Sequence, residues 1–376
     1  MSGGGLSPAP VDLRAVRRQL AAWPAGLPMA DAWAHPALHW DAGSLSIVAA
    51  PTSAGKTTFL SWQVLEWLQQ RSDGGTGRIL IWSSETPAPL YVARLVGMLA
   101  GRPMLAVAAQ ERRGLLEPEV SHAWSDATVW ADRLVVLDDS GDVASAGALA
   151  DAARTLAAEP GGLAAVVVDY LQELPMVHPD HPDADRYARS REAEVGAVAR
   201  CLRQLASELA VPVIAAAQFN RTIGKTTEFV PDLQQLRESG RIEQNASLVL
   251  GLRNAQMSGA PKAPAPGRDW AKLRGDRLAY SAYNGLTAAR LGAQVGVREQ
   301  FGPERTLAEV FVLKNRWRGH VGTVVPVALE PPSGRWLRLA ARYVPPVTGS
   351  KRGSSADRAL ALVGSGRAQD DEEAGA

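Results

Sequence analysis

Cysteine is the scarcest residue in this chain of 376 residues, because only Cys201 is present. A lone cysteine excludes an intramolecular disulfide and a zinc site built from cysteine side chains. Cys201 stands in a segment with helical periodicity, which favours a small buried side chain. Because the sequence offers no disulfide framework, we expect a cytoplasmic protein.

Long hydrophobic runs and a charge of one sign are also missing. No run reaches the roughly eighteen apolar residues that a membrane-spanning helix requires, and the N-terminus lacks a secretory signal pattern, so we expect no membrane partner. The formal net charge of +1 neither favours nor excludes nucleic acid. Lysine is scarce, at six of the 40 basic residues, so a lysine at a motif position carries extra weight.

What the sequence does contain is a globular composition, with 46% hydrophobic and 21% charged residues. Short apolar runs alternate with helical patterns, which predicts an α/β fold with a mostly parallel central sheet flanked by helices. The predicted strands cover residues 45–49, 78–83, 134–137, 164–168, 211–217, 247–252 and 306–313. The two clearest predicted helices cover residues 57–70 and 192–209.

Composition also divides the chain into segments. We expect an N-terminal arm or linker over residues 1–40, a main domain over 41–345 and a disordered tail over 346–376. Residues 255–305 hold several glycines and prolines with eight basic and four acidic residues, which predicts an irregular insertion. Trp270 in this insertion could stack on a base, but a solvated basic loop explains it equally well.

Residues 50–57 read Ala-Pro-Thr-Ser-Ala-Gly-Lys-Thr and lie between a predicted strand and a predicted helix. They fit the P-loop template except that Ala50 replaces its first glycine. Such a loop points backbone N–H groups at phosphate, so we expect Lys56 to reach the β- and γ-phosphates of ATP and Thr57 to ligate Mg²⁺. The predicted nucleotide-binding residues are Pro51, Thr52, Ser53, Ala54, Gly55, Lys56, Thr57 and Thr58.

Polar side chains at other strand ends can complete this chemistry. Asp169 ends one apolar strand and is a candidate for the magnesium shell. Glu85 follows another and could position or deprotonate the attacking water, while Gln218 and Asn220 could sense the γ-phosphate. Each has a plainer interpretation, respectively a helix cap, a first-turn glutamate and the start of a polar loop, and the residues alone leave these open.

Several segments in order resemble the DnaB family of replicative ring helicases. They are residues 50–57, 83–86 with Arg94, 168–172, 211–221, 236–244 and 314–316. The most specific is Leu-Arg-Glu-Ser-Gly-Arg-Ile-Glu-Gln at 236–244, in which only Arg241 is unusual. The resemblance covers roughly residues 40–330 and implies a RecA-like P-loop NTPase fold, in an ATP-driven DNA helicase of six-subunit rings that acts on single-stranded DNA in replication.

The resemblance also implies residue roles. The nucleotide would lie between subunits, with DNA in a central channel. The residues acting on the nucleotide of their own subunit would be Lys56, Thr57, Glu85, Asp169 and Gln218. The residues reaching the γ-phosphate of a neighbouring subunit would be Lys314 and Arg316. The residues on loops that hold the DNA backbone would be Arg221, Lys225, Arg237, Glu238 and Gly240.

Three features depart from the family pattern. About forty residues precede the motor, too few for the family's collar domain, so a primase or loader as partner lacks support. Residues 314–320 read Lys-Asn-Arg-Trp-Arg-Gly-His instead of the usual polar-glycine continuation, and the insertion is foreign to the pattern. A host, phage or mobile-element protein therefore stays open. So does an alternative function, a RecA-like ATPase that switches assembly or partner binding without unwinding.

Overall fold

The structure is a computed structural model that describes residues 12–35, 38–70, 77–138, 145–177, 190–219, 231–254, 297, 300–302 and 305–339. For residues 237–239 only the backbone is described. The expected disordered tail at 346–376, the first eleven residues of the expected arm and most of the expected insertion lie outside these ranges. The individual residues singled out above that also lie outside them are Asn220, Arg221, Lys225 and Trp270.

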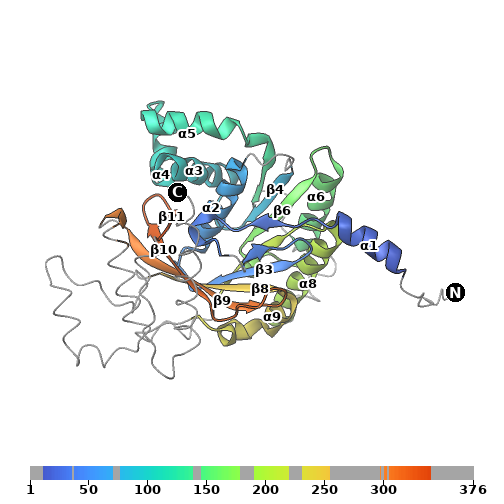
Figure 1. The fold of residues 1–376 in the computed structure, drawn as a ribbon. Helices are drawn as coiled ribbons and strands as arrows, with labels where there is room; N and C mark the ends of the chain where they lie inside the picture. The colour runs from blue at the N-terminus through green and yellow to red at the C-terminus, as the bar shows by residue number, and fades with distance from the viewer. Residues whose placement is uncertain are drawn as a thin grey trace, which may run out of the picture.

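A nine-stranded sheet forms the centre of the molecule, in the order β11-β10-β9-β8-β3-β7-β6-β4-β5 (Figure 1). The six parallel strands are β3 (Leu45–Ala50), β4 (Arg78–Ser83), β5 (Leu134–Asp138), β6 (Leu163–Asp169), β7 (Val213–Gln218) and β8 (Leu248–Asn254). The antiparallel extension consists of β9 (Thr306–Asn315), β10 (Val324–Glu330) and β11 (Arg335–Arg338). The predicted mostly parallel sheet is confirmed, although β7 starts after Pro212, which has no N–H for the ladder.

Helices cover both faces of the sheet (Figure 1). One face carries α2 (Lys56–Gln69) and the trio α3 (Ala88–Ala100), α4 (Met104–Arg113) and α5 (Pro118–Thr128). The other carries α6 (Ala146–Ala158), α8 (Arg191–Leu209) and α9 (Gly240–Asn245). Each face of the sheet has its own apolar core, and alternate residues of β3 point into one core or the other. Val48 packs with residues of α2, whereas Ile47 packs with residues of α6 and α8. Burial on both faces explains why these strands are continuous apolar runs.

The N-terminal segment joins the core before β3 begins. Helix α1 (Leu13–Ala22) projects from the body (Figure 1), and β1 (Leu27–Pro28) then pairs with β2 (His39–Trp40). Trp33 and Trp40 are fully buried. Trp33 stacks on Phe59 of α2 with ring centroids 3.9 Å apart, and the Gln63 amide oxygen accepts a 2.8 Å hydrogen bond from Trp40 Nε1. The domain body therefore includes aromatic side chains from the segment expected as an arm.

None of the described helices is by itself long and apolar enough to cross a membrane. Helices α3 and α4 meet the length and composition criteria as a pair, but they are bent by 104°.

Candidate active site

The loop between β3 and α2 turns sharply at two positions. Ser53 has φ 62° and Gly55 has φ 96°, both in the left-handed region. A Cβ on Gly55 would also lie 3.1 Å from Thr58 Oγ1 and 3.4 Å from the ring of Trp336 in β11, so glycine is required there. Ala50, by contrast, is the last residue of β3 and pairs with Gln218 of β7. An extended strand residue needs no glycine, which explains the departure from the P-loop template.

Lys56 folds back across this loop. Its Nζ donates to the carbonyl oxygens of Ala50 (3.3 Å) and Pro51 (3.1 Å). Burial lowers the pKa of Lys56, and the nearby charges of Asp169 and Glu85 oppose that shift. The ammonium group is thus held within the loop and close to both carboxylates that were expected beside it.

Asp169 lies at the end of β6 and is only 3% exposed. Burial raises its pKa, while a hydrogen bond from the Thr57 hydroxyl and the charges of Arg94 and Lys56 act in the opposite direction. The carboxylate and hydroxyl oxygens therefore lie side by side next to the lysine. Among the described residues no cluster of three or more His, Cys, Asp or Glu could hold a metal ion.

Glu85 lies just beyond the tip of β4 and is exposed. The backbone holds this tip beside β6, since Ser84 N–H donates to Asp169 O at 2.9 Å. Helix α3 starts later, at Ala88, whose N–H is capped by Asp138 Oδ2 at 2.7 Å. Glu85 is therefore not a first-turn glutamate, and its charge acts on the P-loop lysine.

Gln218 ends β7 next to the P-loop. Its Nε2 donates to Thr52 Oγ1 at 2.5 Å. Gln172, which follows β6, brackets the Gln218 backbone, accepting from its N–H and donating to its carbonyl, each at 3.1 Å. Gln172 was not singled out from the sequence, although it closes the 168–172 motif. It fixes the strand tip that carries Gln218.

The P-loop lies at the edge formed by the C-terminal ends of the parallel strands. Lys314 and Arg316 lie at the opposite edge, where β3 and β8 begin. Antiparallel β9 places Lys314 opposite Val249 of β8, which in turn pairs with Ile47 of β3. The P-loop is three residues further along β3, so roughly 10 Å along the strands and two strand spacings, roughly 10 Å, separate Lys314 from it. Neither cation can therefore reach the P-loop of its own chain.

The carbonyl groups at the end of α9 hold both cations. Lys314 Nζ donates to Glu243 O at 2.5 Å, and Arg316 Nη2 donates to Gln244 O at 3.2 Å. Burial, followed by the charge of Arg316, lowers the pKa of Lys314. The two cations thus lie together at the C-terminal end of α9.

The backbone of the 236–244 segment is a short 3-10 helix over Leu233–Ser239 followed by α9. A capping box of Asp232 and Gln235 starts it. Arg237 and Glu238 lie in the 3-10 helix, and Gly240 is the first residue of α9 and exposed. Arg241, the unusual residue of this segment, packs against Gly196 of α8. A Cβ added to Gly196 would lie only 2.4 Å from Arg241 Cδ, which is too close. A glycine in the facing helix thus makes room for this arginine.

The mostly parallel sheet and the P-loop between β3 and α2 define a P-loop NTPase of the RecA-like class. The chain belongs to the family of DnaB-like helicase C terminal domains, whose family model matches residues 37–327. The replicative DNA helicase DnaB of Pasteurella multocida (strain Pm70) is 34% identical over 207 residues, covering 55% of this chain and 41% of that protein. The Haemophilus influenzae protein of the same name is 31% identical over 210 residues, with the same coverage. The chain therefore spans about two fifths of these relatives.

Solved structures show the same fold. A DnaB-like replicative helicase, described with its interactions with primase, superposes with a TM-score of 0.60 and 19% identity over 87% of this chain and 68% of that one. A second solved structure, that of an ATPase domain, superposes with a TM-score of 0.59 and 19% identity over 87% of this chain and 97% of that one. The expected RecA-like architecture is confirmed.

Proposed function

We propose that this chain is the ATP-driven motor of a DnaB-type ring helicase, which moves along single-stranded DNA during replication in a host, phage or mobile element. One observation carries the proposal. The sheet holds Lys56, Thr57 and Asp169 together at one edge, and presents Lys314 and Arg316 at the other. Two half-sites on opposite edges of one subunit suit a closed ring, in which each nucleotide lies between neighbours.

At the P-loop, ATP would be bound by residues 51–58 with Lys56 against the β- and γ-phosphates. Mg²⁺ fits this site, since it prefers oxygen ligands and needs few from the protein when phosphates and water supply the rest. Thr57 and Asp169 would hold it, and when bound it would neutralise charge on the phosphates. Gln218, held beside Thr52, would sense the γ-phosphate, and Glu85 would orient or deprotonate the attacking water.

Replacing Glu85 with glutamine is expected to leave ATP binding intact and to slow hydrolysis by about 10²–10⁴-fold, the contribution of a general base. The amide keeps the shape of the carboxylate but accepts protons poorly. Steady-state ATPase and binding of a fluorescent ATP analogue would measure the two effects. Glu117→Gln, an exposed carboxylate paired with Arg102, is the control. Loss of ATP binding in Glu85→Gln would instead make Glu85 a structural residue.

DNA binding would use Arg237, Glu238 and Gly240, together with Arg221 and Lys225 earlier in the sequence. Contacts to phosphate suit a motor that must slide over any sequence. Single-strand affinity should then fall with salt, with a slope of about −0.7 per phosphate neutralised.

Arg237→Ala is expected to make that salt slope shallower by about 0.7 if the arginine neutralises one phosphate. It should also uncouple ATP hydrolysis from stimulation by DNA. Fluorescence anisotropy with a labelled oligonucleotide at several salt concentrations measures the slope. Arg112→Ala, at the exposed end of α4, should change neither property. Binding that does not depend on salt would count against the proposal.

Unwinding itself is tested by strand displacement on a forked duplex. The proposed helicase should displace the strand only with ATP and only when Lys56 is intact. ATP hydrolysis without displacement would favour the alternative of an assembly switch.

A relative of known structure was described with primase. A primase or loader for this chain, and its place in the cytoplasm, are extensions of the proposal that co-purification and fractionation would test.

A further inference from the structure

The end of β9 and the turn that follows it carry Lys314 and Arg316, the two cations proposed to reach a neighbouring subunit, and hydrogen bonds hold this turn in place. Arg316 N–H donates to Ser247 O at 2.8 Å, which ties the turn to the start of β8. Asn315 Oδ1 accepts the Arg318 N–H at 3.1 Å, and Asn315 O accepts the Gly319 N–H at 3.2 Å. Trp317, between the two arginines, is 52% exposed. Residues 314–319, which carry the two cations proposed to reach a neighbouring subunit, thus form a compact turn at the surface.

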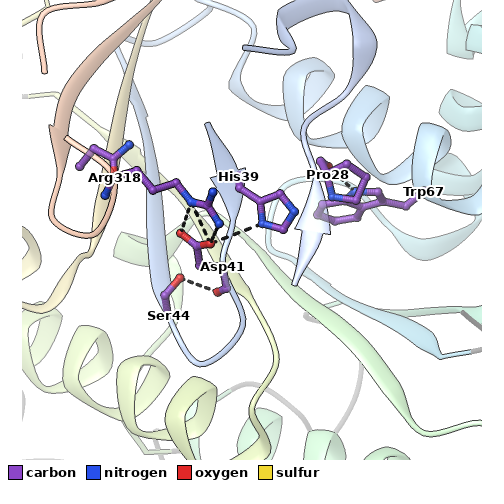
Figure 2. Close-up of polar contacts among 7 residues, drawn as sticks. Pro28, His39, Asp41, Ser44, Trp67 and Arg318 are labelled. Atoms are coloured by element: carbon purple, nitrogen blue, oxygen red, sulfur yellow. Dashed lines mark hydrogen bonds and ion pairs between the residues drawn. The ribbon is translucent and has the colours of Figure 1, made fainter. Parts of the chain in front are cut away.

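Arg318 then clamps this turn to a distant segment (Figure 2). Its Nε lies 3.1 Å from both Asp41 oxygens, and its Nη2 also donates to Oδ1. His39 points at the same carboxylate, with Nδ1 3.5 Å from Oδ1, and the Ser44 hydroxyl donates to Asp41 O at 2.7 Å. The guanidinium meets the carboxylate as a fork, which fixes direction as well as distance.

Asp41 is well suited to hold this contact. Burial by itself would raise the pKa of Asp41, but the adjacent His39 and Arg318 side chains outweigh it and lower the pKa. The carboxylate is therefore ionised at neutral pH. It lies four residues before β3, the strand that ends in the P-loop. The clamp thus joins the turn carrying Lys314 and Arg316 to the segment that leads into β3, the strand that ends in the same subunit's P-loop.

We propose that Arg318, held by Asp41, is a positioning residue that sets the direction in which Arg316 projects toward a neighbouring subunit. This inference rests on the proposed function. Exposed ion pairs add little stability by themselves, so geometry is the property that such a clamp would supply.

Arg318→Ala is expected to lower kcat for ATP by about 10–100-fold, because a misplacement of about 1 Å costs roughly that much. The KM for ATP and the affinity for a fluorescent ATP analogue should not change, since the P-loop of each subunit keeps its contacts. The kcat of Arg318→Lys should lie between those of the unmodified protein and Arg318→Ala, because an ammonium group keeps the charge but cannot form the fork. Thermal unfolding monitors whether each variant is folded.

The decisive comparison is with Arg316→Ala. If Arg318 acts through Arg316, adding Arg318→Ala to Arg316→Ala should cause no further loss, because the two residues act as one unit. Arg154→Ala is the matched control, since Arg154 forms a similar fork with Glu208 between α6 and α8. Its kcat should equal that of the unmodified protein.

Three results would overturn the inference. If Arg318→Ala had a normal kcat while Arg316→Ala were severely impaired, the positioning role of Arg318 would be refuted, but Arg316 would still be the proposed finger. Losses that multiply in the double variant, or that track a lower unfolding temperature, would make Arg318 merely structural. Normal hydrolysis in Arg316→Ala would remove the finger assignment itself, and the inference with it.

Discussion

Replacing Arg316 with alanine is expected to reduce ATP hydrolysis by about 10³–10⁵-fold, the range found for arginine fingers. The guanidinium would place a fixed positive charge where the γ-phosphoryl group develops negative charge in the transition state. Because Arg316 lies across the sheet from its own P-loop, the loss should appear in assembled rings, and an isolated monomer should already be nearly inactive. Steady-state ATPase with size-exclusion chromatography measures both.

Arg338→Ala provides the control for Arg316→Ala. Arg338 is a partly exposed arginine on β11 and pairs with Asp31 at 2.8 Å. Its removal costs one surface ion pair and should leave hydrolysis unchanged. If Arg316→Ala hydrolyses ATP as fast as Arg338→Ala, then Arg316 is not a finger.

Lys56→Ala is expected to abolish hydrolysis. The variant removes the cation that would neutralise the β- and γ-phosphates, and no other lysine or arginine of the described residues donates to the P-loop carbonyls of Ala50 and Pro51. The fold should survive, because the hydrogen bonds of Lys56 stay within the loop and its side chain belongs to neither apolar core. ATPase activity and a thermal unfolding curve would be measured together.

Thr58→Ser is a conservative change within the same proposed nucleotide-binding loop and gives a comparison for Lys56→Ala. The serine keeps a hydroxyl for the 2.8 Å bond that Thr58 donates to Gly55 O. It should therefore retain most activity, whereas Lys56→Ala retains none. Hydrolysis at the normal rate in Lys56→Ala would remove the nucleotide-site assignment.

Much of the P-loop edge could be predicted from the sequence, because the relevant information is local. A buried parallel strand is a continuous apolar run, and the polar residue that follows it marks the strand end. Parallel strands bring all such ends to one edge. Asp169, Glu85 and Gln218 were placed there for this reason, and the charge of Glu85 does act on Lys56.

Contacts between distant segments could not be predicted. Periodicity shows that a face is buried but not which segment covers it. Trp33, Phe59 and Trp336 form one aromatic cluster, although they come from the N-terminal segment, α2 and β11. The Arg318–Asp41 clamp likewise joins residues 277 positions apart. No local pattern reports such a pairing, and strands β10 and β11 were also not predicted.

Mixing two inactive variants tests most directly whether the site is shared between subunits. Rings assembled from Lys56→Ala and Arg316→Ala subunits should regain hydrolysis that neither variant shows alone. At some interfaces the intact P-loop of an Arg316→Ala subunit would meet the intact finger of a Lys56→Ala subunit. Native mass spectrometry with subunits of two sizes would verify that mixed rings form. Recovered ATPase activity is the predicted result, and mixed rings that stay inactive would contradict the account.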